Sequence, residues 1–185
     1  MSLFHTLRTR FEKGFRSSTH WLGRIVLSEE FWDLPDPFWV RAEVTGDDLD
    51  RLGHVNNAVY LAWCEQVAWD HAEAVGAGWD VWKQLDRGMA VQSVRLDYEA
   101  AAYQNDELLL GNWIAKNDRR LRATRRFQIV RSSDQQTLLR GEVDYVCIEL
   151  STGRPRRFPQ AFKEAYSVLP QVQAELDKRA TGSGA

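Results

Sequence analysis

The fold of this chain is decided by the stretch Asp48-Leu49-Asp50-Arg51-Leu52-Gly53-His54-Val55-Asn56-Asn57, which stands directly before a helical segment. Gly53 permits a tight backbone turn. The Ala-rich segment 58–75 that follows is expected to be a helix, and Gly76 is expected to stop it. The residues that this helix offers for burial are Leu61, Trp63, Val67 and Ala68. The sequence therefore predicts a carboxylate-bearing turn at the start of one long helix.

Strand-like segments make up most of the remaining chain. They alternate apolar and polar residues and are separated by turn residues such as Asn105-Asp106 and Asn117-Asp118. The expected strands are 38–45, 89–98, 107–116, 121–130 and 137–150. Such short connections favour antiparallel neighbours. We therefore expect an α+β domain in which an antiparallel sheet of about five strands covers the long helix.

Charge divides the chain near Ser28. Residues 1–28 are basic and residues 29–50 are acidic, and Pro35 and Pro37 follow the change. The helical spacing of Phe4, Leu7, Phe11 and Phe15 predicts an N-terminal helical extension. Its docking on protein is favoured over contact of residues 1–28 with a membrane surface. The predicted units are an extension over 1–37, a domain over 38–160, and a C-terminal helix with a flexible tail over 161–185.

Composition narrows the class of protein. The formal net charge of −2 gives no basic field for a nucleic-acid partner. No apolar run could span a bilayer, and no signal segment opens the chain. Cys64 and Cys147 form neither a disulfide framework nor a Cys-x-x-Cys motif, and the four His residues lack metal-ligand spacing. We expect a cytoplasmic protein with no metal and no cofactor.

The Asp48–Asn57 stretch suits acyl-transfer chemistry. A helix N-terminus leaves backbone N–H groups unpaired, and these groups attract developing negative charge. Thioester hydrolysis needs a base or nucleophile near the carbonyl carbon and hydrogen-bond donors on the carbonyl oxygen. From the spacing alone, an aspartate that merely caps the helix remains an alternative, with Asn56 and Asn57 as polar turn residues.

A family resemblance bears on that choice. The pattern Asp48-x-Asp50-x-x-Gly53-His54-Val55-Asn56-Asn57-x-x-Tyr60-x-x-Trp63-x-Glu65 resembles acyl-CoA thioesterases of the 4-hydroxybenzoyl-CoA thioesterase type, in the subgroup that carries Gly-His-Val-Asn-Asn. Leu96-Asp97-Tyr98 and Tyr145-Val146-Cys147-Ile148-Glu149 also resemble that family. The resemblance covers about residues 38–160. It implies the hotdog fold, an acyl-CoA substrate, and assembly into homodimers or tetramers.

The resemblance also implies roles for single residues. Asp50 takes the place of the catalytic carboxylate, as nucleophile or general base. The backbone N–H near Asn57 takes the place of the donor that polarises the carbonyl. Glu65 is a second catalytic candidate, although a buried carboxylate bonded across a dimer is the preferred interpretation for it. The residues expected to line the substrate site are Asp48, Gly53, His54, Val55, Asn56 and Tyr60.

Weaker candidates and competing functions remain at this point. A turn role is preferred for His54 and a buried helix position for Cys64. The arginines at 119, 120, 122, 125 and 126, and those at 154, 156 and 157, are read as solvated faces, with contact to coenzyme A phosphates as the alternative. Residues 99–105 lack the proline and glycine common in relatives. The alternatives to acyl-CoA hydrolysis are a non-catalytic acyl-thioester sensor and an acyl-carrier-protein thioesterase.

Overall fold

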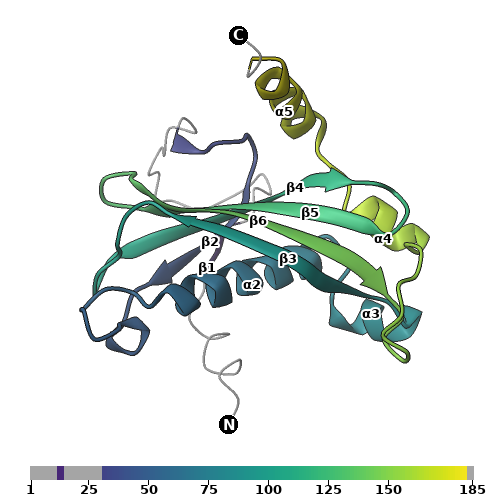
Figure 1. The fold of residues 1–185 in the computed structure, drawn as a ribbon, viewed down its shortest axis with the longest axis horizontal. Helices are drawn as coiled ribbons and strands as arrows, with labels where there is room; N and C mark the ends of the chain where they lie inside the picture. The colour runs from purple at the N-terminus through teal and green to yellow at the C-terminus, as the bar shows by residue number, and fades with distance from the viewer. Residues whose placement is uncertain (1–11, 15–30, 183–185) are drawn as a thin grey trace.

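An antiparallel sheet curves around one long helix in the computed structural model, which describes residues 12–14 and 31–182 (Figure 1). The strands are β1 (Glu12–Gly14), β2 (Phe38–Glu43), β3 (Gly88–Tyr98), β4 (Glu107–Asn117), β5 (Arg122–Arg131) and β6 (Thr137–Ile148). The helices are η2 (Gly46–Asp48), α2 (Asn57–Ala74), α3 (Trp79–Leu85), α4 (Gln160–Ala165) and α5 (Pro170–Gly182).

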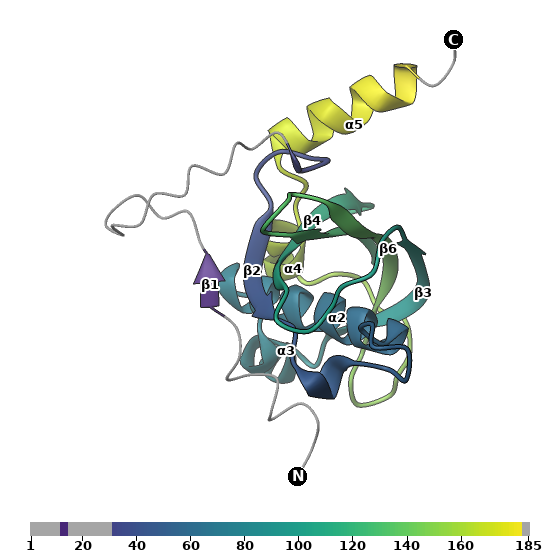
Figure 2. The same ribbon diagram turned by 90° about the vertical axis from the view of Figure 1, so that its left-hand side faces the viewer.

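The sheet has the order β1-β2-β4-β5-β6-β3, and every neighbouring pair is antiparallel. Helix α2 follows β2 in the chain and lies in the hollow of the sheet, so that the chain crosses to the far edge before β3 begins (Figure 2). Alternate strand residues face α2 because side chains of a strand point to opposite faces. On α2, Trp63, Val67 and Ala68 are buried against that face as predicted, whereas Leu61 is 41% exposed.

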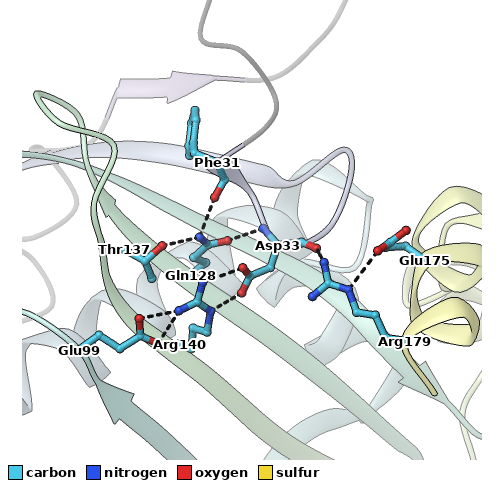
Figure 3. Close-up of polar contacts among 8 residues, drawn as sticks. All are labelled: Phe31, Asp33, Glu99, Gln128, Thr137, Arg140, Glu175 and Arg179. Carbon is cyan, nitrogen blue, oxygen red and sulfur yellow. Dashed lines mark hydrogen bonds and ion pairs between the residues drawn. The ribbon is translucent and has the colours of Figure 1, made fainter. Parts of the chain in front are cut away.

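The outer face of the sheet is also covered in part. Leu34, Trp113 and Val172 form a small buried cluster there, to which α5 contributes Val172. Beside it, the fully buried amide of Gln128 accepts the Asp33 N–H at 2.7 Å and donates to Phe31 O and Thr137 Oγ1 (Figure 3). Gln128 thus fastens the segment before β2 to the sheet.

Arginine side chains reinforce the same attachment. Arg140 on β6 forms ion pairs with both Asp33 and Glu99 (Figure 3). Arg179 of α5 donates to the carbonyl oxygen of Asp33 and pairs with Glu175 (Figure 3). These groups are partly exposed, so the buried Gln128 amide is expected to contribute more to stability than the ion pairs do.

We expect Gln128→Leu to lower the free energy of unfolding by about 1–3 kcal/mol, because it leaves buried partners without their hydrogen bonds. Urea denaturation at fixed protein concentration measures the change. Gln104→Leu is the matched control, since Gln104 is exposed. Equal stability of the two variants would show that the Gln128 contacts carry no net free energy.

Two terminal predictions need correction. Residues 12–14 form strand β1, not part of a helix, and the rest of the predicted extension up to residue 30 lies outside the described residues. Near the C-terminus, one helix with a tail was expected over 161–185, but the structure has two helices, α4 ending at Ala165 and α5 extending to Gly182. The packing of α5 on the sheet stabilises a longer helix than the local sequence pattern predicts. Within the described part of the chain, no helix has the length and apolar character needed to cross a membrane.

Candidate active site

The turn before α2 is a short antiparallel loop closed by backbone hydrogen bonds. Asp50 N–H donates to His54 O at 2.8 Å and Asn56 N–H donates to Asp48 O at 2.9 Å, with a bridge between Leu49 and Val55. Gly53 has φ +78°, a conformation that an L side chain rarely adopts. Val55 is buried and anchors the loop in the core. The loop therefore holds Asp50 in a fixed backbone position.

The two aspartates of this loop have different surroundings. Asp48 is buried, and its Oδ2 accepts hydrogen bonds from Thr45 N–H at 2.7 Å and Thr45 Oγ1 at 2.9 Å. Asp50 is half-buried, and its Oδ1 accepts the Leu52 N–H at 2.7 Å. Among the described residues, Asp50 accepts side-chain hydrogen bonds through one carboxylate oxygen only. Asp48 thus fits a loop-shaping role, while Asp50 keeps an oxygen that can face a substrate.

One backbone N–H group at the start of α2 has no acceptor among the described residues. Asn56 is the N-cap residue, and its Oδ1 accepts the Ala58 N–H at 2.9 Å. Val59 N–H donates to Asn56 O. The N–H of Asn57 makes no hydrogen bond to any described residue, and Asn57 is exposed. An unpaired N–H at a helix N-terminus is a suitable donor for an oxyanion.

Aromatic residues hold the helix start in place. The hydroxyl of buried Tyr60 accepts the Ala102 N–H at 3.1 Å, and the Tyr98 hydroxyl donates to Asn57 O at 3.0 Å. The ring of His54 meets Tyr103 edge-to-face at 5.2 Å. Tyr60 is 2% exposed and supports the helix start, and its expected place in the substrate site stays a prediction.

Glu65 lies further along α2 and borders a cavity of about 230 Å³ between α2 and strands β3, β5 and β6. Glu65 is exposed in the single chain, and its expected burial across a dimer stays a prediction. Cys64 also borders the cavity, and burial raises the pKa of its thiol to about 12, which rules out a thiolate nucleophile at neutral pH. Within the described residues, no group of His, Cys, Asp or Glu side chains is arranged to hold a metal ion.

A buried polar cluster at this cavity was missed by the sequence interpretation. Arg125 is only 5% exposed, and its Nη1 donates to Asn112 Oδ1 at 2.6 Å and to His71 Nδ1 at 2.8 Å. Burial, together with the charge of Arg125, lowers the pKa of His71 to about 3. Arg125 had been grouped with solvated arginines. On β5, Arg125 lies on the same strand face as Ala123 and Phe127, which are two residues away on either side. This spacing of two was the signal in the sequence that could have predicted its burial.

The other arginines of that group behave as a solvated face. Arg126 points away from α2 and pairs with Glu142, and the arginines at 119, 120, 122, 154, 156 and 157 are exposed. Residues 119–122 and 154–157 thus remain available to solvent, as the sequence interpretation expected.

A family model described as the thioesterase-like superfamily matches residues 44–166, which is more than half of the chain. The chain belongs to this superfamily. Its model match spans the Asp48–Asn57 loop, α2 and strands β3 to β6.

Solved structures with the same fold include a 1,4-dihydroxy-2-naphthoyl-CoA thioesterase from Synechocystis, with TM-score 0.64 and 21% identity over 71% of this chain and 96% of that one. A DHNA-CoA thioesterase from Staphylococcus aureus gives TM-score 0.63 and 17% identity over 80% and 95%. A hypothetical protein from Staphylococcus aureus in complex with CoA gives TM-score 0.66 and 18% identity over 71% and 82%. The sheet around α2 is therefore the hotdog fold, as predicted.

Proposed function

We propose that this protein hydrolyses an acyl-CoA thioester to a free carboxylic acid and coenzyme A, with Asp50 as nucleophile or general base. The proposal rests on two groups that flank the same turn: the half-bonded Asp50 carboxylate, and the Asn57 N–H at the start of α2, which has no acceptor among the described residues. Membership of the thioesterase-like superfamily and the Gly53-His54-Val55-Asn56-Asn57 motif support this assignment.

The two groups have complementary tasks in that reaction. The Asn57 N–H would stabilise the negative charge that develops on the thioester oxygen, assisted by the positive end of the helix dipole. Asp50 would either attack the carbonyl carbon, forming a mixed anhydride that water then hydrolyses to the free acid, or take a proton from the water that attacks the carbon directly. In both routes the thiolate of coenzyme A leaves as the carbon–sulfur bond breaks. Both tasks are local to one loop and one helix start, so the chemistry needs no metal or cofactor.

Coenzyme A is the preferred carrier of the acyl group. The CoA-bound Staphylococcus aureus structure and the two structures described as CoA thioesterases support this choice. An acyl-carrier protein would present the same thioester, and a non-catalytic sensor could bind it without turnover. Asp50 argues against the sensor, because binding alone needs no carboxylate at the thioester.

A screen of acyl-CoAs of varied chain length and aromaticity, with chemical detection of free thiol, tests the proposal. We expect at least one substrate to yield acid and coenzyme A in equal amounts. Binding without thiol release across the series would favour a sensor, and turnover only with acyl-carrier-protein thioesters would change the carrier.

We also propose that the protein works as a homodimer or a tetramer of dimers joined through β3. This strand is an edge of the sheet, and no strand of the described residues pairs with its outer side. The apolar side chains exposed around it are Leu61, Val91, Val94 and Tyr98. A second copy of β3 would cover both the edge and these side chains with one symmetric contact.

Sedimentation equilibrium at micromolar concentration is expected to give at least twice the chain mass of 21.4 kDa. Val94→Arg should shift the protein toward the monomer, because it places a charge in the apolar contact. Gln104→Arg, at an exposed site on another part of the surface, should leave the mass unchanged. A wild-type species of only 21 kDa would contradict the proposed assembly.

A further inference from the structure

The cavity beside α2 has mostly apolar walls and one buried cation. Leu61, Ala68, Val94 and Val143 contribute to the walls, and Arg125 is the cationic side chain that borders it. Leu61 and Val94 lie at the open side of the cavity, where the second copy proposed above would border its mouth, whereas Arg125 is 5% exposed. A chain-like apolar ligand that entered at the open side would meet a guanidinium in the interior.

The recorded partners of Arg125 leave its charge uncompensated. Its hydrogen bonds run from Nη1 to an amide oxygen and to the ring nitrogen of His71, whose low pKa keeps that ring neutral at physiological pH. Nε and Nη2 make no hydrogen bond to any described residue, and no described carboxylate lies within ion-pair distance. Burial raises the pKa of neighbouring Tyr145 to about 12, so this phenol is neutral as well.

An isolated buried charge is costly, and proteins normally provide a partner for it. Glu65 borders the same cavity, but it is exposed and makes no recorded ion pair. The cavity therefore offers a strong cationic donor whose natural partner would be an anion brought by the ligand.

Two further polar groups of the cavity wall lie beside each other and have no other partner among the described residues. These are the hydroxyl of Tyr166 and the indole N–H of Trp82, both buried. The guanidinium carbon of Arg125 lies 5.5 Å from the centre of the Tyr166 ring. Burial raises the pKa of Tyr166 against the opposing effect of Arg125, so its hydroxyl keeps a proton to donate. The Trp82 N–H faces the Tyr166 oxygen, so the Arg125 guanidinium and the Tyr166 O–H are the two donors that remain for a ligand in this part of an apolar cavity.

We propose that this cavity selects acyl groups that carry a carboxylate at the end remote from the thioester, with Arg125 binding that carboxylate and Tyr166 assisting. The inference rests on the proposed thioesterase function and names its substrate class as the monothioester of a dicarboxylic acid. A planar guanidinium with two unused nitrogens matches a carboxylate in geometry as well as in charge.

The phosphates of coenzyme A fit this position less well. They belong to a large, strongly hydrated group that would have to enter a cavity with aliphatic walls, and exposed arginines such as Arg119 and Arg154 offer easier contacts at the surface. A carboxylate at the end of an apolar chain satisfies both the walls and the cation.

The test compares kcat/KM for pairs of acyl-CoAs of equal chain length, one with a terminal carboxylate and one with a terminal methyl group. In the wild type, the carboxylate member of at least one pair should be preferred by about 10- to 100-fold, the range of a charged hydrogen bond. Arg125→Met should abolish this preference, measured as the ratio of kcat/KM for the two members of a pair. Arg125→Lys should restore part of it, and Tyr166→Phe should reduce it without loss of the fold.

Calorimetry with free dicarboxylates and matched monocarboxylates gives a readout that does not depend on catalysis. Stronger binding of a dicarboxylate to wild type than to Tyr166→Phe or Arg125→Met supports the assignment even if no thioester is hydrolysed, in which case the proposed function alone fails. Turnover without preference for the carboxylate, or no difference between the two acid classes, overturns it. Weaker binding of free coenzyme A to Arg125→Met, with unchanged acyl preference, also overturns it.

Discussion

Asp50→Asn is expected to lower kcat for thioester hydrolysis by about 10²–10⁴ while changing KM little. The amide keeps the shape of the side chain and can still accept the Leu52 N–H, so the loop is retained. It lacks the basic, nucleophilic oxygen that the reaction requires. The Asn57 N–H is a backbone group and remains in place, which accounts for the residual rate. Steady-state kinetics with the best acyl-CoA measures both constants.

Two variants make this result specific. Asp47→Asn is the matched control, because Asp47 lies in the same loop region, is exposed, and has no proposed role in the reaction. Glu65→Gln distinguishes the two candidate carboxylates. A larger loss in Glu65→Gln than in Asp50→Asn, with an intact circular dichroism spectrum, would transfer the catalytic role to the helix.

Trp63→Ala is expected to lower the free energy of unfolding by about 3–5 kcal/mol. Trp63 is 2% exposed, lies at the centre of the α2 face that the sheet covers, and meets Tyr60 edge-to-face at 5.4 Å. Its removal would leave a large gap between helix and sheet. Guanidinium denaturation at one fixed protein concentration measures the loss, since assembly makes stability concentration-dependent.

Trp79→Ala is the control for that experiment, because Trp79 is 48% exposed on α3. Its loss of stability should be clearly smaller. Equal losses would mean that the α2 core does not dominate the stability of the domain.

Local patterns in the sequence were sufficient for the central fold. Helix α2 was predicted within one residue at each end, because Asn56 caps its start and Gly76 follows its end in a left-handed conformation. The strands were predicted from their alternation and turn residues, and their ends differ by a few residues only. The short strand β1 and the full extent of α5 depend on pairing and packing with distant segments, which local patterns do not encode.

The candidate site likewise has one part that the sequence predicted and one part that it did not. The roles proposed for Asp50 and Asn57 came from a contiguous motif, and the loop around them is closed by hydrogen bonds between near neighbours. The cluster of His71, Asn112 and Arg125 joins α2, β4 and β5, so no sequence spacing brings these residues together. Arginine is also seldom buried without a carboxylate, which made a solvated interpretation of Arg125 the natural one.

The most direct test of the central claim is the single-turnover rate of acyl-CoA hydrolysis with enzyme in excess, measured for the wild type and for Asp50→Asn. These conditions follow the chemical step without product release. For the wild type we expect release of one thiol per substrate molecule, with a time course that follows a single exponential. For Asp50→Asn we expect a rate lower by about 10²–10⁴. Equal rates for the two proteins would contradict the assignment of Asp50 as the catalytic carboxylate.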